Sequence, residues 1–428
     1  MNNEKKSYVL PIAMMFALFF MIAFVTGLPA PFGVIVKNQF GATDFMSTLG
    51  YFANFIAYAF MGIPAGMLLQ RIGYKNTALA AIVVGFTGVG IQFLSGIVGD
   101  FSVYIAGAFV SGFSMCMLNT VVNPMLNTLG GGGKKGNQLI QTAGSLNSVA
   151  ATIVPVLVGY LMGSQMEQRT IEKANPALFI AMGIFTITFI VLFFMQIPEP
   201  HKERTQATLQ TKNEHSPLAF RHFILGAIAI FIYVGVEVGV PHFINLFMTS
   251  EISAGGLAID PAVAGTVAGT YWFLMMIGRI AGASLAGRFT SKTMLTTASI
   301  IGIILVFFAI TSSSDTVVNM PVFQSDISFG LAEVPVSIML LVFIGLCTSV
   351  MWGGIFNLAV EGLGKYTEAA SGIFMVMVAG GGILPLIQGG VADATGYLPS
   401  YWIIFAGLAY MLFYALIGSK NVNKNIPV

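Results

Sequence analysis

Two charged side chains lie within stretches of sequence that are otherwise uncharged. Glu237 lies in the run from 222 to 250 and Arg279 in the run from 261 to 287, and neither run contains another Asp, Glu, Lys or Arg. An ionised side chain at the centre of a bilayer costs about 3 kcal/mol or more, so such groups face a protein interior or a wet cavity. Pro241 follows Glu237 by four residues, and its ring removes the hydrogen bond that would reach the Glu237 carbonyl. A carboxylate beside a freed carbonyl predicts a site for H⁺ or Na⁺.

Each of these charges has an alternative interpretation. Glu237 can instead be a protonated carboxyl or part of an interhelical ion pair that only positions its helix. Arg279 lies about two turns before Arg288, so its long side chain can reach toward the aqueous boundary. We expect Arg279 to form a gating or structural ion pair rather than to contact a solute. Glu361, close to Lys365, is expected in a gate or a surface pair.

Amide side chains recur at helical spacing in the first half of the chain. Asn119, Asn123 and Asn127 are four residues apart, which places them on one stripe of a helix. Pro124 frees the Thr120 carbonyl within the same stretch. Amides both donate and accept hydrogen bonds, so this stripe suits a solute rich in hydroxyl groups, such as a sugar. The alternative is hydrogen bonding between helices that only holds a bundle together.

Further polar and aromatic residues are candidates for the same site. His242 is of a type that titrates near neutral pH, although a lone histidine is more often a structural partner. Trp352 can stack on the apolar face of a sugar ring or simply pack among the helices. The predicted solute-binding residues are Asn119, Asn123, Gln141, Asn147, His242, Asn357, Gln388 and Trp352.

The composition excludes an ordinary water-soluble protein. Of 428 residues, 56% are hydrophobic and 8% are charged, whereas a soluble domain has roughly 25% charged residues. The net charge of +2 argues against a nucleic-acid partner. Cys116 and Cys347 lie in apolar stretches, where we expect them to be buried. No catalytic Cys/His pair, zinc-ligand spacing or ATP-binding motif is present, so we expect neither an enzyme nor a bound cofactor.

Twelve stretches without Asp, Glu, Lys or Arg, apart from the two charges above, are long enough to cross a bilayer, which takes about 20 residues. The first is too long for the apolar part of a cleavable signal peptide and is expected to be retained. The sequence therefore predicts an all-α membrane protein of twelve transmembrane helices. The predicted spans are 7–36, 45–70, 76–99, 101–133, 136–166, 174–198, 222–250, 261–287, 293–314, 334–360, 369–392 and 394–419.

The basic residues predict how the chain is oriented in the membrane. Of 19 Lys and Arg residues, fifteen fall on the side of the N-terminus, whereas only Lys37, Arg169 and Lys173 fall on the other side. Basic residues gather on the cytoplasmic side of membrane proteins. We therefore expect a multi-pass protein of a bacterial cytoplasmic membrane with both termini in the cytoplasm.

Matched positions indicate an internal repeat. Asn123 and Gly130 have the same spacing as Asn357 and Gly364, and each half has a basic turn after its second span. Repeated halves predict a solute site between them near the midplane of the bilayer, with access alternating between the two sides. The predicted organisation is two pseudo-symmetric six-helix bundles, 1–198 and 218–428, joined by a cytoplasmic linker, 199–217.

The segment from Gly66 to Lys75 reads Gly-Met-Leu-Leu-Gln-Arg-Ile-Gly-Tyr-Lys and resembles the signature that the major facilitator superfamily carries between spans two and three. Gln70 stands where that signature has an acidic residue, and the resemblance implies a gating or structural role for Arg71. The chain is similar in particular to the fucose–galactose–glucose:cation symporter family. The matching blocks are Asn119–Pro124, Gln141–Thr142, Tyr233–Gly239, Tyr271–Arg279 and Ile355–Asp393.

The chain departs from fucose-type members at positions that matter for mechanism. Asn119 stands in place of their coupling glutamate, and the region from Thr26 to Pro31 lacks their acidic residue of span one. Gly144 aligns with their sugar-contacting asparagine, while Asn147 lies one turn further on. The pattern Asn-Ser-Ile-Met-Phe-Pro becomes Thr-Ser-Val-Met-Trp-Gly at 348–353.

The resemblance implies a secondary active transporter that works as a monomer in the lipid bilayer. Its expected solute is a small neutral molecule, foremost a hexose such as glucose, galactose or fucose, coupled to H⁺ or Na⁺. Two alternatives stay open. One is an exporter or a carrier of another polar metabolite, and the other is a transport-inactive membrane sensor.

Overall fold

The structure is a computed structural model that describes residues 8–27, 44–162, 171–199, 215–313, 316–324, 328–423 and 425–427. Most of the first predicted span is present as a helix, and its predicted part from 28 to 36 lies outside the described residues. The same holds for residues 200–214 of the predicted linker.

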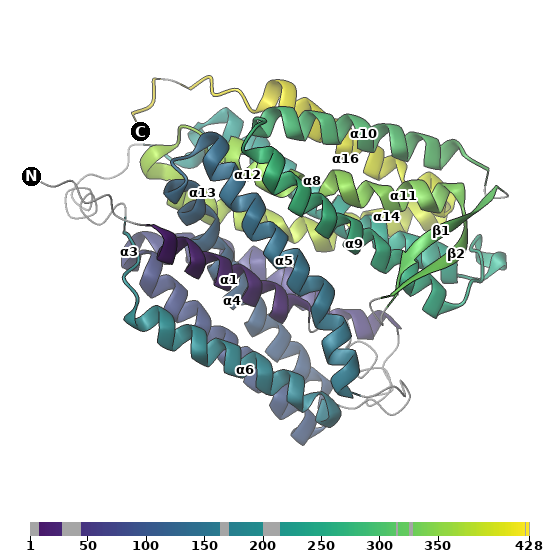
Figure 1. Ribbon diagram of the computed structural model, residues 1–428, viewed down its shortest axis with the longest axis horizontal. Coiled ribbons are helices and arrows are strands. Elements are labelled where there is room, and N and C mark those ends of the chain that lie inside the picture. Colours follow the sequence, from purple (N-terminus) through teal and green to yellow (C-terminus); the bar gives the residue numbers. More distant parts are fainter. Residues whose placement is uncertain are drawn as a thin grey trace, which may run out of the picture. The chain divides into compact units, whose positions relative to one another are not determined.

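The chain forms two compact units, each built of long helices (Figure 1). Unit 1 comprises residues 1–219, 362–376 and 426–428, and unit 2 comprises 220–361 and 377–425. The predicted boundaries of two six-helix halves stay a prediction. The helices of unit 1 are α1 (Val9–Gly27), α3 (Asp44–Val98), α4 (Phe101–Leu129), α5 (Gly133–Met162), α6 (Ile171–Phe194), η2 (Pro217–Ala219), η4 (Gly364–Tyr366) and α13 (Thr367–Val376).

Unit 2 holds the remaining helices and a two-stranded antiparallel sheet. Its elements are α8 (Arg221–Thr249), η3 (Ile252–Ala254), α9 (Pro261–Ala286), α10 (Ser291–Thr311), β1 (Val317–Phe323), β2 (Phe329–Pro335), α11 (Val336–Thr348), α12 (Met351–Val360), η5 (Met377–Ala379), α14 (Gly380–Thr395), α15 (Tyr397–Ser400), α16 (Trp402–Phe413) and η6 (Tyr414–Gly418).

The helices confirm the predicted fold class. Within the described residues, ten segments are long and apolar enough to cross a membrane. One of them, Phe52–Val98, is 47 residues long and therefore holds two spans, which meet at a non-helical residue, Gly73. Helix α5, with 30 residues, supplies the remaining span. Among the described residues, three spans consist of more than one helical element: α11 with α12, then η4, α13, η5 and α14, and finally α15, α16 and η6.

The turn between the second and third spans is fixed by an acidic side chain from further along the chain. Gly73 has φ +82°, which favours glycine, and a Cβ there would lie 2.6 Å from a carboxylate oxygen of Glu199. The two Glu199 oxygens accept the backbone N–H groups of Tyr74, at 2.9 Å, and Lys75, at 3.0 Å. These amides begin the second half of α3 and have no partner within their own helix. Glu199, although distant in sequence, therefore caps the N-terminal end of the second half of α3.

Glycine allows α3 and α13 to approach closely within unit 1. A Cβ on Gly372 would lie 2.7 Å from the Gly62 carbonyl oxygen and 2.8 Å from the Gly66 Cα. Such small-residue contacts permit backbone approach between helices in membranes, where the hydrophobic effect gives little drive for association.

The hairpin of β1 and β2 was not predicted from the sequence. The tenth span was expected to begin at residue 334, but the strand continues to Pro335 and α11 begins at Val336. Proline pushes the preceding residue toward extended backbone, which keeps Val334 in the strand, and Pro335 itself is extended (φ −55°, ψ 145°) as the N-cap of α11. The register pairs Val317 with Pro335 and Phe323 with Phe329.

Candidate functional site

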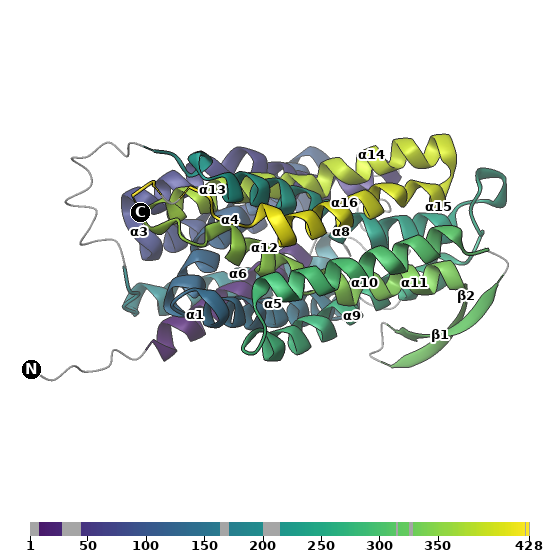
Figure 2. The ribbon, with the colours of Figure 1, turned by 90° about the horizontal axis from the view of Figure 1, so that it is seen from above.

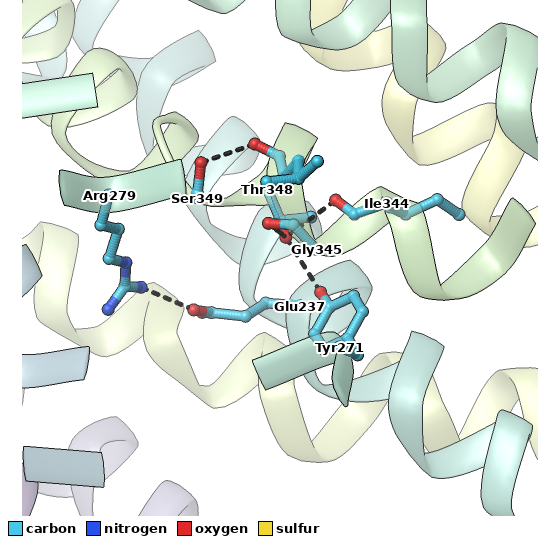
Figure 3. A network of polar contacts seen from close by, with 8 residues as sticks. Glu237, Tyr271, Arg279, Ile344, Gly345, Thr348 and Ser349 are labelled. Atoms are coloured by element: carbon cyan, nitrogen blue, oxygen red, sulfur yellow. Dashed lines mark hydrogen bonds and ion pairs between the residues drawn. The ribbon is translucent and has the colours of Figure 1, made fainter. Parts of the chain in front are cut away.

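The two charges within spans meet in unit 2. The Arg279 guanidinium on α9 donates to the Glu237 carboxylate on α8 at 2.8 Å (Nη2 to Oε1). Their side chains are only 12% and 14% exposed, so the pair is largely desolvated (Figure 3). Tyr233, one turn before Glu237, is fully buried and interacts electrostatically with both charged groups. This is the interhelical ion pair that the sequence left open as the alternative for Glu237 and favoured for Arg279.

Close packing of α9 on α11 positions the arginine of this pair. Tyr271 of α9 hydrogen-bonds to Thr348 at the end of α11, with 3.0 Å between their hydroxyl oxygens. The backbone of α9 lies directly on α11, because a Cβ on Gly345 would clash with the Tyr271 carbonyl and one on Gly278 with Ser349. Figure 3 shows this hydroxyl contact beside the ion pair. The guanidinium is therefore held by a rigid helix contact rather than by a flexible loop.

Trp352 belongs to the same neighbourhood. Its ring lies 6.3 Å from the Tyr233 ring, at a tilt of 57°. Tyr233 of α8 therefore contacts the Trp352 ring of α12 and interacts with the Glu237 carboxyl one turn further along its own helix. Two aromatic rings next to a buried ion pair offer both an apolar surface and charged hydrogen-bonding groups. That combination suits a sugar ring, which has apolar faces and a polar rim.

The asparagine stripe of α4 forms a hydrogen-bonded cluster in unit 1. Asn119 and Asn123 are 8% and 0% exposed. The Asn119 amide donates to the hydroxyl of Tyr58 on α3 at 3.0 Å, and the Asn123 amide donates to the Asn119 carbonyl at 2.9 Å. The Thr120 carbonyl, which Pro124 was expected to free, accepts a hydrogen bond from the Ser371 hydroxyl of α13 at 3.2 Å. Within unit 1, this part of α4 therefore contacts α3 through Asn119 and α13 through the Thr120 carbonyl.

Tyr58 is a residue that the sequence did not single out. It lies 61 residues from Asn119 in an apolar span, and a lone tyrosine there has no spacing to mark it. Asn54, one turn earlier on α3, was missed for the same reason. It is 6% exposed and its amide has no hydrogen-bond partner within the described part of the chain. The uncommonness of amides inside spans was the one available signal for Asn54.

The two candidates on α5 lie in different settings. Gln141 is 3% exposed, and its backbone carbonyl accepts the Ser145 hydroxyl at 2.9 Å. Asn147 is half-buried and donates to the Phe19 carbonyl of α1 at 3.1 Å. Asn147 therefore already connects two helices of unit 1.

The remaining amide candidates of unit 2 are spread along its helices. Asn357 donates to the Ser291 hydroxyl at 2.8 Å, where α10 begins. Gln388 is 1% exposed and donates to the Ser400 hydroxyl at 3.3 Å. Its carbonyl oxygen lies against α8, since a Cβ on Gly239 would lie 2.9 Å from it. Gln388 thus reaches the helix of Glu237, whereas Asn357 lies toward the other end of the unit.

Three candidates are exposed. His242 lies on α8 with its ring edge-on to Phe243. Arg71 lies two residues before the Gly73 turn. The side chain of Glu361 is exposed at the end of α12, and its backbone carbonyl contacts the buried ring of His222 at 3.0 Å.

Metal-binding groups were also sought in the structure. Within the described residues there is no cluster of three or more His, Cys, Asp or Glu side chains that could hold an ion. Cys116 and Cys347 are free and buried, as the sequence predicted.

Long apolar helices, two of which hold a buried ion pair, define a polytopic helical membrane protein. The chain matches the Major Facilitator Superfamily over residues 15–384 and belongs to this superfamily. The resemblance noted from its sequence is therefore confirmed.

Named relatives cover nearly the whole chain. A glucose/galactose transporter of Brucella abortus (strain 9-941) is 29% identical over 98% of this chain and 97% of its own length. The L-fucose-proton symporter of Escherichia coli (strain K12) is 23% identical over 94% of this chain and 91% of its own length. The crystal structure of the major facilitator transporter FucP in the outward conformation superposes with a TM-score of 0.77 at 20% identity, covering 97% of this chain and all of that one. The fold is therefore that of a major facilitator.

Proposed function

We propose that the protein is a secondary active transporter that moves a hexose such as glucose, galactose or fucose across the cytoplasmic membrane by alternating access. The proposal is supported by membership of the Major Facilitator Superfamily and by relatives named as a glucose/galactose transporter and an L-fucose-proton symporter, which match over more than nine-tenths of their length. The observation that carries it is the desolvated Glu237–Arg279 pair beside Tyr233 and Trp352. A buried charge pair is costly to maintain for stability alone, and replacing one by apolar residues is often neutral or stabilising.

The ion pair favours H⁺ over Na⁺ as the coupling ion. A sodium ion at Glu237 would lie beside the Arg279 guanidinium, which is 2.8 Å from the carboxylate. Two cations a few ångströms apart in a desolvated site repel each other strongly. A proton needs no such space, because it neutralises the carboxylate and frees the guanidinium to bind other acceptors. The hydroxyls of a bound sugar are acceptors of this kind.

The solute is proposed to bind through amides and aromatic rings. Support comes from the burial of Asn119, Asn123, Gln141 and Gln388 within membrane-crossing helices and from the contact of Trp352 with Tyr233. A site whose buried polar groups are placed to hydrogen-bond hydroxyl groups strongly rejects a solute that lacks those hydroxyls.

The topology belongs to the same proposal. Both termini are placed in the cytoplasm because basic residues gather on that side. The protein is proposed to act as a monomer in the bilayer, without a bound cofactor.

Uptake in proteoliposomes tests this function. Purified protein is given a panel of radiolabelled hexoses under a proton gradient alone and under a sodium gradient alone. The proposal predicts concentrative uptake of at least one hexose under the proton gradient. The Glu237→Gln variant should lose concentrative uptake but keep exchange of sugar across the membrane, with Glu333→Gln as a matched control outside the spans.

Three results would contradict the proposal. Uptake driven by sodium alone would overturn the choice of ion, and movement of none of the hexoses while another polar metabolite moves would overturn the solute class. Binding of a sugar without any movement would identify a sensor.

A further inference from the structure

One polar atom beside the Glu237–Arg279 pair lacks a hydrogen bond. The hydroxyl of Tyr233 is enclosed by protein, and within the described residues it has no hydrogen-bond partner. Helix α8, which carries this tyrosine, lies beside α9 and α12 in unit 2 (Figures 1 and 2). Buried polar groups of folded proteins are almost always hydrogen-bonded, so this exception needs a physical explanation.

The surroundings of the hydroxyl limit what its partner can be. The Tyr233 ring contacts the neutral ring of Trp352 on α12. Within the described residues, the charged and titratable groups that act on it are Glu237 of its own helix and Arg279 and Tyr271 of α9. The Tyr271 hydroxyl has a hydrogen bond of its own. Water does not reach the Tyr233 oxygen, because that atom exposes less than 1 Å².

Among the described helices packed on α8, only α9 brings a charge to this hydroxyl. Helices α11, α12 and α16 contain no charged residue. Helix α14 contains Asp393, which is about 14 Å further along its axis than Leu384, the residue that packs on Gly235 of α8. A partner for the Tyr233 hydroxyl must therefore come from the ion pair itself.

The ionised pair does not use the hydroxyl. The Arg279 guanidinium donates to the Glu237 carboxylate at 2.8 Å, as Figure 3 shows. The Tyr233 hydroxyl is close enough to interact with both groups, yet it meets the distance and angle of a hydrogen bond with neither. Removing the hydroxyl should therefore cost the ionised pair little.

Protonation of Glu237 creates a need for an acceptor. The new carboxyl O–H is a hydrogen-bond donor, and the Arg279 guanidinium has five donors but no acceptor. A tyrosine hydroxyl can accept as well as donate. Tyr233 precedes Glu237 by four residues, which places the two side chains on the same face of α8. Its oxygen is thus an unused acceptor beside the carboxyl.

We propose that Tyr233 is a positioning residue for proton coupling, whose oxygen accepts the hydrogen bond of the protonated Glu237 carboxyl once that carboxyl has released Arg279. The proton comes from water and binds a carboxylate oxygen, so no covalent bond to Tyr233 forms or breaks. The inference rests on the proposed coupling to H⁺. It deepens that proposal by naming the group that stabilises the proton-loaded state.

The pH dependence of sugar exchange tests this role. Exchange of radiolabelled glucose, galactose and fucose is followed in proteoliposomes with equal pH on both sides, from acid to alkaline pH. Tyr233→Phe loses an acceptor only in the protonated state, so its half-maximal exchange should move toward acid by about one pH unit, a roughly tenfold loss of proton affinity. Tyr414→Phe removes another enclosed hydroxyl of unit 2 that has no partner within the described residues, and it should keep the parental profile.

Melting in detergent makes the same comparison without a solute. At alkaline pH, Tyr233→Phe should melt at or above the temperature of the parent, because a buried hydroxyl without a partner adds no stability. At acid pH it should melt about 1–2 °C below the parent, since only the protonated carboxyl uses the hydroxyl. In a Glu237→Gln background, the amide does not titrate, so the effect of Tyr233→Phe should be the same at every pH.

The inference is overturned if Tyr233→Phe and the parent differ in melting temperature by the same amount at acid and at alkaline pH. Recovery of Tyr233→Phe as misfolded protein would overturn it too, because the hydroxyl would then support the fold in every state. A parent that exchanges none of the three hexoses contradicts the proposed solute class instead, and the melting comparison still decides the role of Tyr233.

Discussion

Removing one charge of the buried pair should be far more harmful than removing both. In Arg279→Met, the Glu237 carboxylate keeps its 14% exposure but loses the guanidinium at 2.8 Å. Two unit charges about 4 Å apart interact by about 4 kcal/mol at an effective dielectric constant of 20, and breaking a buried pair typically costs about 3–5 kcal/mol. We therefore expect Arg279→Met to destabilise the protein by about 4 kcal/mol. Glu237→Gln alone should cost a similar amount, because it leaves the cation unpaired.

The double variant Glu237→Gln/Arg279→Met removes both buried charges and should recover most of that loss. A double-mutant cycle on the purified protein in detergent, followed by reversible denaturation or by thermal unfolding, gives the coupling energy between the two side chains. Contacting residues in one network show couplings of up to about 3 kcal/mol, whereas independent sites add within about 0.5 kcal/mol. A double variant that is as unstable as the sum of the singles would refute the reasoning, because the pair would then not be interacting in the folded protein.

Three further predictions concern unit 1. Glu199→Gln keeps the shape of the side chain but weakens two charge-assisted hydrogen bonds to backbone N–H groups. The free energy of unfolding should therefore fall by about 1–3 kcal/mol. In the same melting assay, Glu333→Gln at an exposed position should leave the melting temperature unchanged. Gly372→Leu cannot be accommodated between the backbones of α13 and α3, so its yield as a monodisperse protein should fall severalfold, whereas Gly390→Ala, which has open space around it, should behave as the parent in size-exclusion chromatography. Tyr58→Phe removes the hydroxyl that accepts one hydrogen bond from the buried Asn119 amide, which then keeps only its bond to the Met115 carbonyl, so a loss of about 1–2 kcal/mol is expected, and an unchanged melting temperature would contradict it.

The spans could be predicted because a bilayer imposes its constraint locally. Each segment that crosses hydrocarbon must satisfy its own backbone, and only a helix of about 20 apolar residues does so in one stretch. The two in-span charges and the Gly73 turn were visible for the same reason, since a charge or a basic turn stands out against an apolar background. The consequence of Pro124 was also legible in sequence, because a proline frees a carbonyl at a fixed spacing within its own helix.

The hairpin escaped prediction because a strand has no local sign of this kind. Its two segments are short, each contains a proline, and neither can satisfy its backbone without the other. The sequence around Val317 does not indicate that this residue pairs with Pro335, because strand pairing depends on a segment elsewhere in the chain. Its return along α9 depends on the contact of Phe323 with Phe273, which lies 50 residues away in sequence.

By itself, then, the sequence determined the class of molecule, the number of spans and the residue types that a solute and a coupling ion would require. The tertiary structure alone decided the partners: Arg279 for Glu237, Tyr58 for Asn119, and the caps of Glu199 on α3. The physical reason is the range over which each interaction acts. Apolarity and proline geometry act within one helix, whereas a hydrogen bond or an ion pair forms only between side chains that helix packing brings within about 3 Å.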